Sequence, residues 1–334
     1  MKLLLLPDSM CRKRLTFFLA MEEWAARSLP ADEYFFIWEV GPTVICGRNQ
    51  ETDKEIDIEF CRCSGIDICR RRSGGGAVLA DNDNFMFSYI APGDDTEKIF
   101  HRFTARVAAM LQSLGLEAEA RGRNDIYIGG RKISGGAYYK LPGRGIAHST
   151  MLYSFNPEMM RKALTPSRGK LESKGVTSVE ASVSSLSAEG LRMSQQEFKD
   201  YIQKSVTDDT LTLGNANISA IEEIQRRYDD PAFIFGKKTE YRHTASSTTY
   251  VKGAGNIDIA IAIAPDGTIA RFDIKGDFLG NRDCGEIEKR LQGIKADITT
   301  IKSRLAGFDT GKVIHGLDTQ TFTDLIDRTL KETT

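Results

Sequence analysis

The chain of 334 residues is long enough for about two domains, and its 41% hydrophobic and 27% charged residues are typical of a globular protein. A formal net charge of −1 excludes the strong basic field of general nucleic-acid binders, so we expect no nucleic-acid partner. The opening run MKLLLL ends at Pro7, too early for a signal peptide, and no run approaches the roughly 18 apolar residues of a membrane span. We therefore expect a cytoplasmic protein with no membrane partner.

The first quarter of the chain predicts strands around one helix. Residues 1–6 predict a short buried strand, and residues 14–29 carry apolar side chains at helical spacing. The apolar, β-rich runs 33–40 and 43–48 are separated by Gly-Pro, so we predict that they form a hairpin. The stretch 74–91 predicts a strand, a polar turn and a second strand.

Three helices are predicted next. Residues 97–120 carry one apolar stripe, and Gly115 marks the expected end of that helix. Residues 194–206 and 217–228 also predict helices. Residues 1–245 therefore form the larger predicted domain, with mixed strands and helices.

The pattern changes near residue 245. Small polar residues at 243–250 predict a linker. Strict alternation then places isoleucines on one face of a predicted strand pair, with Asp266–Gly267 as the hairpin turn. A helix should follow, with an apolar side formed by Ile287, Leu291, Ile294, Ile298 and Leu305. Residues 250–334 therefore predict a self-contained α+β module.

The first candidate site is CRRRSGGGAV, residues 69–78. Consecutive glycines allow a backbone to approach a ligand closely and to point its N–H groups into an anion-binding concavity. Arg70 and Arg71, just upstream, would suit a phosphate or carboxylate. No Gly-Lys-Ser/Thr follows, so the stretch is not a Walker A loop. A tight turn with solvated arginines is the alternative.

The second candidate site is GRNDIYIGGRKISGG, residues 122–136. A two-residue turn at Gly129–Gly130 would pair Tyr127 with Lys132, Ile126 with Ile133 and Asp125 with Ser134. Alternation would then place a carboxylate, a lysine and a hydroxyl on one face, formed by Asp125, Tyr127, Lys132 and Ser134. Gly135–Gly136 would keep the strand bare for a ligand. The alternative is an exposed Asp–Lys pair, which contributes little to stability.

Two further stretches and a cysteine cluster are candidates. AHSTML contains His148 and Thr150, although a lone histidine is more often structural than catalytic. PSRGKLESKGVTSV, residues 166–179, predicts a mobile basic loop of the kind that closes over phosphates, or else a solvated surface loop. Cys61, Cys63 and Cys69 could form a metal or redox site. No second Cys or His pair lies at metal spacing, which favours free thiols.

Taken together and in this order, these stretches resemble the lipoate–protein ligase family. The family's Arg-Arg-x-Ser-Gly-Gly-Gly-Ala-Val and Asp-x-Gly-Asn run is matched by RRRSGGGAVLADNDN. Its Gly-Arg-Asn-Asp, Arg-Lys-Ile-Ser-Gly and His-Gly-Thr-Leu-Leu stretches are matched by GRND, RKISG and HSTML, and its Lys-Gly-Ile-x-Ser-Val loop by KGVTSV. The resemblance is close over residues 1–186. Residues 250–334 resemble the family's small accessory domain.

The resemblance implies both a fold and a reaction. The fold class is α/β (α+β), with a catalytic domain at 1–245 built on a mixed, mainly antiparallel sheet flanked by helices, and a small C-terminal α+β accessory domain at 250–334. The reaction uses ATP and Mg²⁺ to convert lipoate, or octanoate, to an acyl-AMP. The acyl group then passes to a lysine of an acceptor, either a 2-oxoacid dehydrogenase acyltransferase subunit or the glycine cleavage H protein.

The resemblance also implies roles for particular residues. Lys132 is the catalytic donor to acyl and α-phosphate oxygens and is not a covalent nucleophile. Asn124 and Asp125 lie near the phosphate, with Asp125 a candidate Mg²⁺ ligand. His148 and Thr150 line the ligand tunnel. The other implied lipoate- or adenylate-binding residues are Arg70, Arg71, Ser73, Gly74, Gly75, Gly76, Ala77, Ser134, Gly135, Lys174, Gly175, Val176 and Ser178.

Three positions depart from the family pattern. His-His-Gly-Thr is replaced by Ala147–Thr150 (Ala-His-Ser-Thr), the turn glycine is Asp83, and Arg-Ser-Arg is replaced by Glu180–Ser182 (Glu-Ala-Ser). Two alternatives therefore stay open: a diverged octanoyl- or lipoyltransferase that uses a cysteine thioester without ATP, and a non-catalytic protein that binds acyl groups or lipoyl domains. No cysteine lies between residues 70 and 283, where a transferase nucleophile is expected, and this favours the ligase.

Overall fold

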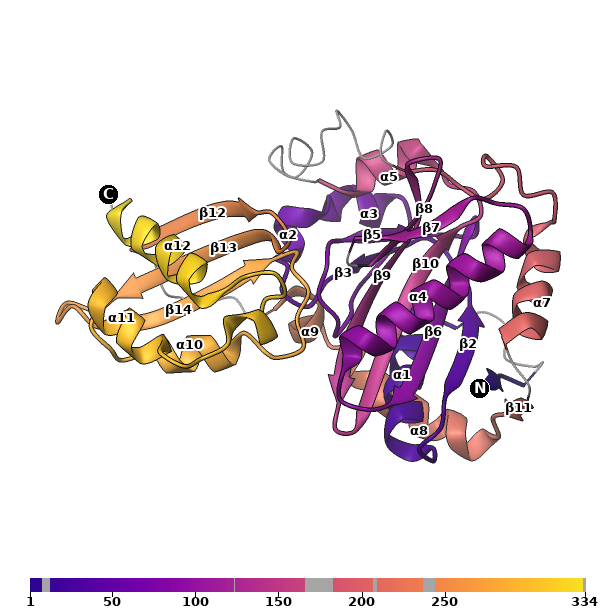
Figure 1. The fold of residues 1–334 in the computed structure, drawn as a ribbon, viewed down its shortest axis with the longest axis horizontal. Coiled ribbons are helices and arrows are strands. Elements are labelled where there is room, and N and C mark those ends of the chain that lie inside the picture. The colour runs from indigo at the N-terminus through magenta and orange to yellow at the C-terminus, as the bar shows by residue number, and fades with distance from the viewer. Residues whose placement is uncertain (8–12, 123, 166–182, 207–208, 237–243, 333–334) are drawn as a thin grey trace. The chain divides into compact units, whose positions relative to one another are not determined.

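The computed structural model describes residues 1–7, 13–122, 124–165, 183–206, 209–236 and 244–332. Its backbone forms two compact units (Figure 1). The larger unit consists of Met1–Cys46, Thr52–Arg71 and Ala77–Phe235, and the smaller unit of Gly47–Glu51, Arg72–Gly76 and Gly236–Thr334. Two short segments from the first quarter of the chain thus belong to the smaller unit. Of the helices in the described ranges, none is both long enough and apolar enough to cross a bilayer.

The larger unit is built on a mixed sheet. Within the described residues this sheet has eight strands, in the order β11, β1, β2, β6, β10, β9, β8, β7. Their bounds are β1 Lys2–Leu5, β2 Tyr34–Trp38, β6 Asn84–Pro92, β7 Ala118–Arg121, β8 Asp125–Ile128, β9 Arg131–Leu141, β10 Arg144–Leu152 and β11 Asp209–Thr212. β1 is parallel to β11 and β2, and the other neighbours are antiparallel. The predicted mixed, mainly antiparallel sheet is confirmed.

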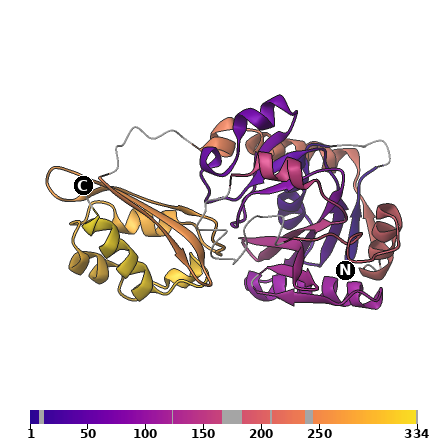
Figure 2. The same cartoon turned by 90° about the horizontal axis from the view of Figure 1, so that it is seen from above.

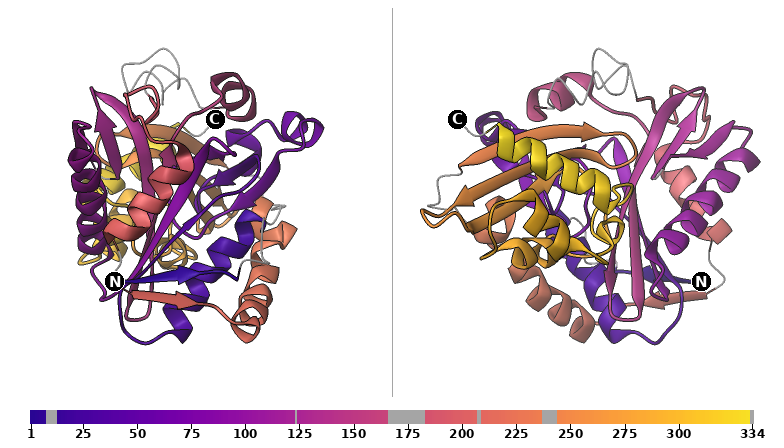
Figure 3. Two further views of the ribbon diagram at one scale, coloured as in Figure 1. Left: turned by 90° about the vertical axis from the view of Figure 1, so that its right-hand side faces the viewer. Right: turned by 60° about the vertical axis from the view of Figure 1, so that its left-hand side comes forward.

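Two long helices cover opposite faces of this sheet (Figure 3). They are α1 (Leu15–Ser28) and α4 (Thr96–Ser113), both predicted from their apolar spacing. The Asp95 side chain accepts a hydrogen bond from the Lys98 amide at 3.0 Å and so caps the start of α4. Gly115, with φ of 81°, follows the helix end as predicted. The predictions of α7 (Gln195–Val206) and α8 (Asn215–Tyr228) are confirmed as well.

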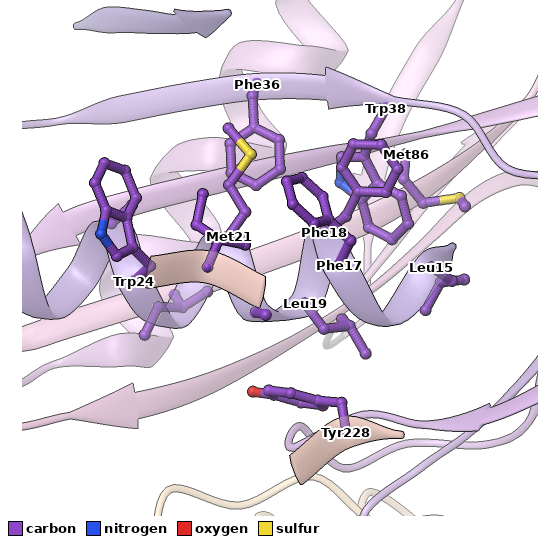
Figure 4. Packing of buried hydrophobic residues seen from close by; sticks show 14 of the residues in the cluster. Leu15, Phe17, Phe18, Leu19, Met21, Trp24, Phe36, Trp38, Met86 and Tyr228 are labelled. Carbon is purple, nitrogen blue, oxygen red and sulfur yellow. The ribbon is translucent and has the colours of Figure 1, made fainter. Parts of the chain in front are cut away.

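The sheet is buried on both faces where α1 and α4 cover it. Alternation along β2 directs Trp38 toward α1, where its ring stacks on Phe18 with centroids 5.0 Å apart (Figure 4). Phe35 points the other way, and its ring centroid lies 6.4 Å from that of Phe103 on α4. These contacts fix the central strands, which carry most of the candidate site.

A separate small sheet corrects the hairpin predicted for residues 33–48. Within the described residues its strands are β3 (Thr43–Cys46), β4 (Asp67–Arg70) and β5 (Val78–Ala80), in the order β4, β3, β5. β2 pairs with β1 and β6, so β2 and β3 never pair with each other. Local apolar patterns predict both strands but carry no information on the sheet that each one joins. The short helices in the described part of this unit are α2 (Thr52–Glu55), α3 (Ile58–Cys63), α5 (Pro157–Ala163) and α9 (Pro231–Phe235).

The smaller unit has an antiparallel sheet of β12 (Ala245–Val251), β13 (Gly255–Ile263) and β14 (Ile269–Gly276). The predicted turn at Asp266–Gly267 is confirmed, and Gly267 has φ of 79°. Helices cover one face of this sheet (Figures 1 and 2). They are α10 (Gly285–Leu291), α11 (Ile298–Leu305), the short 3₁₀ helix η2 (Thr310–Lys312) and α12 (Thr319–Lys331).

Two predictions for the smaller unit were wrong. Residues 245–250 belong to β12 and not to a linker, because their alternate side chains pack on α12 despite being small and polar. The helix predicted through Leu305 is two helices, because the chain turns at Gly293, which has φ of 80°. The apolar side chains were nevertheless placed correctly, since Ile287 and Leu305 are fully buried.

Candidate active site

The hairpin of β8 and β9 contains an unpredicted β-bulge. Gly129 and Gly130 form the turn with φ of 55° and 78°, and Tyr127 pairs with Lys132 as expected. The register then shifts by one residue, so that Ile126 pairs with Ser134 and Asp125 pairs with Gly135. Paired residues share a face. Ser134 therefore lies on the face of Ile126, and the prediction that it shares a face with Asp125 was wrong.

Lys132 is held by a carboxylate on the neighbouring strand. Its Nζ lies 2.7 Å from Asp125 Oδ1, and both side chains are mostly buried, with exposures of 27% and 19%. Asp125 Oδ2 accepts a hydrogen bond from the Tyr127 hydroxyl at 3.2 Å. Burial, and next the negative charge of Asp125, raise the pKa of Tyr127 to about 12. The phenol therefore remains a donor at neutral pH, and both oxygens of the carboxylate are engaged.

The two glycines after Lys132 leave room for different neighbours. A Cβ at Gly135 would come within 2.5 Å of Lys132 Nζ, so the bare backbone accommodates the lysine itself. A Cβ at Gly136 would come within 2.6 Å of the Phe100 ring on α4. The glycine pair thus seats the cation on one face of the strand and a core ring on the other.

Asn124 and Thr150 fix the backbone around the lysine. The Asn124 Nδ2 donates to the Gly136 carbonyl at 2.5 Å, and the Gly136 amide donates to the Asn124 carbonyl at 2.8 Å. The Thr150 hydroxyl donates to the Gly135 carbonyl at 3.2 Å. In the described conformation both side chains therefore bind the strand that carries Lys132.

His148 forms part of a buried polar cluster that was not predicted. Its Nδ1 lies 2.9 Å from Oε1 of Glu22 on α1, a residue with no exposed surface. Glu22 also accepts from the Ser88 hydroxyl at 2.6 Å and from the Tyr139 hydroxyl at 3.4 Å. Ser88 in turn accepts from the Trp38 indole N–H at 2.8 Å. A glutamate inside the apolar stripe of α1 was a sequence signal for this cluster, because such a residue needs buried partners.

The lysine site and the Glu22 cluster lie on one face of the sheet. His148 and Thr150 are two residues apart on β10 and so point the same way, about 7 Å apart along the strand. Thr150 pairs with Gly135, which pairs with Asp125, so Asp125 and His148 face the same side of the sheet. The arrangement offers a cation at one end and a buried carboxylate–imidazole pair at the other, which suits an extended ligand with an anionic reactive group.

The residues of the glycine-rich stretch fall into two structural groups. Arg70 and Arg71 are buried in the larger unit, where Arg70 Nε donates to the Ile234 carbonyl at 2.9 Å and Arg71 donates to the Ile45 carbonyl at 3.1 Å. Burial lowers the pKa of Arg71 to about 10, which still leaves it charged at neutral pH. The alternative of solvated arginines is therefore excluded for Arg70 and Arg71, which are each 6% exposed. Ala77 is half-buried against the core beneath the small sheet.

Ser73–Gly76 belong to the smaller unit. The amide of Gly75 donates to the Phe278 carbonyl at 3.0 Å, and the Gly75 φ of 90° is accessible to glycine. A Cβ at Gly74 would clash with the same carbonyl. In this conformation the predicted anion-binding backbone thus packs against backbone of its own unit.

Several predicted binding residues, Lys174, Gly175, Val176 and Ser178, lie outside the described residues, as do Glu180–Ser182. The chain re-enters the described region beside the catalytic candidate. Val183 forms a parallel bridge with Lys132, and the Ser184 amide donates to the Lys132 carbonyl at 2.8 Å. The described segment that begins at Val183 therefore lies next to the lysine.

The cysteine cluster has the character of free thiols. Cys61 and Cys69 are buried and Cys63 is exposed, and none of them forms a disulfide. Burial raises the pKa of Cys61 and of Cys69, which disfavours the reactive thiolate. In the described part of the chain, no group of three or more His, Cys, Asp and Glu side chains is arranged to hold a metal ion.

Comparison with known proteins identifies the class of this chain. Residues 15–207 match the model of the lipoyl protein ligase A/B catalytic domain, and residues 240–326 match that of the bacterial lipoate protein ligase C-terminus. The lipoate–protein ligase LplJ of Bacillus subtilis is 33% identical over 321 residues, covering 92% of this chain and 95% of the relative. Lipoate–protein ligase 1 of Staphylococcus aureus is 34% identical, covering 88% and 91%. The chain belongs to the lipoate–protein ligase family.

Solved structures agree on the fold. The P. falciparum LipL1 structure with lipoate has a TM-score of 0.75 at 18% identity, covering 99% of both chains. A lipoate–protein ligase A structure with ATP bound has a TM-score of 0.60 at 23% identity, covering 70% of this chain and 98% of that chain. The bipartite ligase of Thermoplasma acidophilum, solved in a study that includes its E2 lipoyl domain, has a TM-score of 0.62 at 23% identity and covers 72% and 98%. The expected α/β fold is thus shared with these proteins.

Proposed function

We propose that this chain activates lipoate with ATP and transfers the lipoyl group to a lysine of an acceptor domain. The observation that carries the proposal is Lys132, a mostly buried ammonium held by Asp125 over the bare backbone of Gly135. Family membership supports the same reaction. A lipoate–protein ligase structure with ATP bound supports the nucleotide, and one with lipoate bound supports the acid.

The lysine would act on both steps. A lipoate carboxylate oxygen forms a bond to the α-phosphorus, and the bond from that phosphorus to the bridging oxygen breaks, releasing pyrophosphate. The acceptor amine then attacks the acyl carbonyl, loses a proton, and displaces AMP. Negative charge builds on oxygens near one point in each step, and a preorganised ammonium stabilises it. Lys132 carries three N–H donors, so it can keep Asp125 and still donate to ligand oxygens.

The acyl chain would lie along the strip of sheet from Lys132 to the Glu22–His148 cluster. His148 and Thr150 are proposed to line it, and an octanoyl chain should fit as well. From the family motifs, the backbone of Ser73–Gly76 and the side chains of Arg70 and Arg71 are proposed to border the adenylate. The loop that contains Lys174 would close over it. In this scheme residues 1–245 act as the catalytic domain and residues 250–334 as the accessory domain.

Magnesium is proposed to arrive with the nucleotide. Mg²⁺ is commonly held by one or two carboxylates together with substrate phosphates rather than by a protein cage. The absence of a carboxylate cluster in the described part of the chain fits this pattern. Asp125 is the proposed protein ligand, and the bound ion would neutralise phosphate charge. In the structure its carboxylate is shared by Lys132 and Tyr127.

The proposed acceptors are lipoyl domains of 2-oxoacid dehydrogenase acyltransferase subunits and the glycine cleavage H protein. The study of the Thermoplasma ligase with its E2 lipoyl domain supports the first class. The free thiols of Cys46, Cys61, Cys63, Cys69 and Cys284 are consistent with the proposed cytoplasmic location.

The test is acceptor modification. Purified protein is incubated with lipoate, Mg·ATP and apo H protein, and the acceptor mass is followed. The proposal expects one lipoyl addition that requires both lipoate and ATP. Modification from an acyl-protein donor without ATP would contradict the ligase proposal and support the transferase alternative. Lipoate binding without ATP and without any modification of the acceptor would support the alternative of a non-catalytic binding protein.

A further inference from the structure

Two cross-strand rows lie on the lysine face of β7, β8 and β9. The pairings run from Glu119 to Tyr127 to Lys132 in one row and from Arg121 to Asp125 to Gly135 in the other. Alternation of side chains puts both rows on one face. The rows bring the phenol of Tyr127 beside the carboxylate that holds the catalytic lysine.

Tyr127 and Lys132 contact different oxygens of the Asp125 carboxylate. Its hydroxyl donates to Asp125 Oδ2 at 3.2 Å, while Lys132 Nζ lies 2.7 Å from Oδ1. The terminal torsion of an aspartate has a broad profile, so the carboxylate plane turns easily unless both oxygens are held. A lysine ammonium on its four-carbon stem has no fixed direction of its own. The position of Nζ therefore depends on that plane.

We propose that Tyr127 is a positioning residue for the ligase reaction: its hydroxyl fixes the Asp125 carboxylate, which in turn fixes the Lys132 ammonium where the acyl and phosphate oxygens gain charge. This inference rests on the proposed function of Lys132. It extends that function to a residue two positions away on β8, acting through the carboxylate and without touching the ligand.

A purely structural role explains Tyr127 poorly. Its side chain is half-buried and is not one of the fully buried side chains of the core. Arg121 lies 6.0 Å from the ring centre and is itself paired with Glu119 at 2.6 Å. Both of those charged side chains are more than half exposed, so their pair adds little stability. What distinguishes Tyr127 is the bond from its hydroxyl to Asp125.

The first test compares Tyr127→Phe with Tyr153→Phe. The Tyr153 hydroxyl donates to the Met193 backbone carbonyl at 3.0 Å. Tyr153→Phe therefore removes a hydrogen bond of similar length whose acceptor is a backbone carbonyl and not a carboxylate. In acyl-AMP formation, Tyr127→Phe should lower kcat about ten-fold, within the range for a hydrogen bond to a charged group, and leave both KM values within about two-fold. Tyr153→Phe should leave kcat unchanged. An unchanged kcat in Tyr127→Phe, or a rise in KM alone, would overturn the proposal.

A double-mutant cycle tests whether Tyr127 acts through Asp125. In the Asp125→Asn background, Tyr127→Phe should change kcat by less than about two-fold, because the carboxylate that it orients is already gone. A full ten-fold loss in that background would mean that Tyr127 acts independently and would contradict the inference.

A readout that needs no catalysis separates this inference from the proposed function. Reductive methylation of Lys132, followed by peptide mass spectrometry, reports how firmly its amine is held. Labelling should rise about five-fold in Tyr127→Phe, because the lysine then loses a fixed charge-assisted partner. Lys140, paired with Asp94 at 2.9 Å, serves as the internal reference. An unchanged Lys132:Lys140 ratio would overturn the positioning role even in a protein that failed to make acyl-AMP.

Discussion

At the scale of single residues, the candidate site depends on a few buried charges that are held by specific partners. Asp125 holds Lys132, and Glu22 holds His148. A buried carboxylate without such partners would be costly, so each pair shapes the conformation of its surroundings. The side chain that is removed and the partner that is left behind therefore both determine what a substitution does.

Glu22 provides a residue-scale prediction. Glu22→Ala removes the acceptor of Ser88, Tyr139 and His148 and opens a cavity, so we expect the free energy of unfolding to fall by about 2–4 kcal/mol. Glu22→Gln keeps the volume and one acceptor oxygen and should cost about half as much. Urea denaturation measures both values. Equal losses in the two variants would mean that the retained volume and acceptor oxygen of glutamine contribute nothing, which would contradict the prediction.

At the scale of elements, the bulge in β9 sets the composition of the site. Without the bulge, Ser134 would pair with Asp125 and lie on the same face of the sheet as Lys132. In the observed register Gly135 takes that position. The glycine then lets the lysine side chain lie on the strand.

The two glycines of β9 therefore predict different outcomes for the same substitution. Gly135→Ala places a methyl group against the flexible end of Lys132, so activity should fall at least about ten-fold with little change in stability. Gly136→Ala places it against the Phe100 ring and should cost about 1–3 kcal/mol of stability. Acyl-AMP assays and thermal unfolding of both variants make the comparison. Reversed outcomes would refute the assigned packing roles.

The elements also indicate what a sequence can predict. α1, α4 and the β8–β9 turn followed from periodicity and glycine placement, since those signals are local. The partners of β2 and β3, the bulge beside Ile133 and the break at Gly293 did not follow, because they depend on distant packing. The family motifs found Lys132 and Asp125. Glu22 was missed because it lies in a helix in which most residues are apolar and were predicted only to pack in the core.

At the scale of the whole molecule, the smaller unit combines segments that are distant in sequence. Gly47–Glu51 and Arg72–Gly76 belong to the same unit as the C-terminal third of the chain. Within that unit, the Asn49 carbonyl accepts from the Gly276 amide at 2.9 Å, and the Phe278 carbonyl accepts from the Gly75 amide at 3.0 Å. The glycine-rich stretch is therefore coupled to the fold of the smaller unit.

Gly74 tests this coupling. Gly74→Ala would push a Cβ into the Phe278 carbonyl, so hydrogen exchange at the Gly75 amide, which donates to that carbonyl, should become at least about ten-fold faster. Gly41→Ala is the matched control, since a Cβ there meets nothing within 4 Å. Exchange at Gly75 that is equally slow in both variants would contradict the coupling.

The central claim is that the ammonium of Lys132 drives acyl-adenylate formation. The most direct measurement is pyrophosphate release from lipoate and Mg·ATP with no acceptor present, comparing the unaltered chain with Lys132→Met, which keeps much of the side-chain volume and removes the charge. We expect release and acyl-AMP formation by the unaltered chain, and at least about a 100-fold loss in Lys132→Met, measured at a temperature where thermal unfolding shows that the variant is folded. Pyrophosphate release by Lys132→Met at the rate of the unaltered chain would contradict the claim.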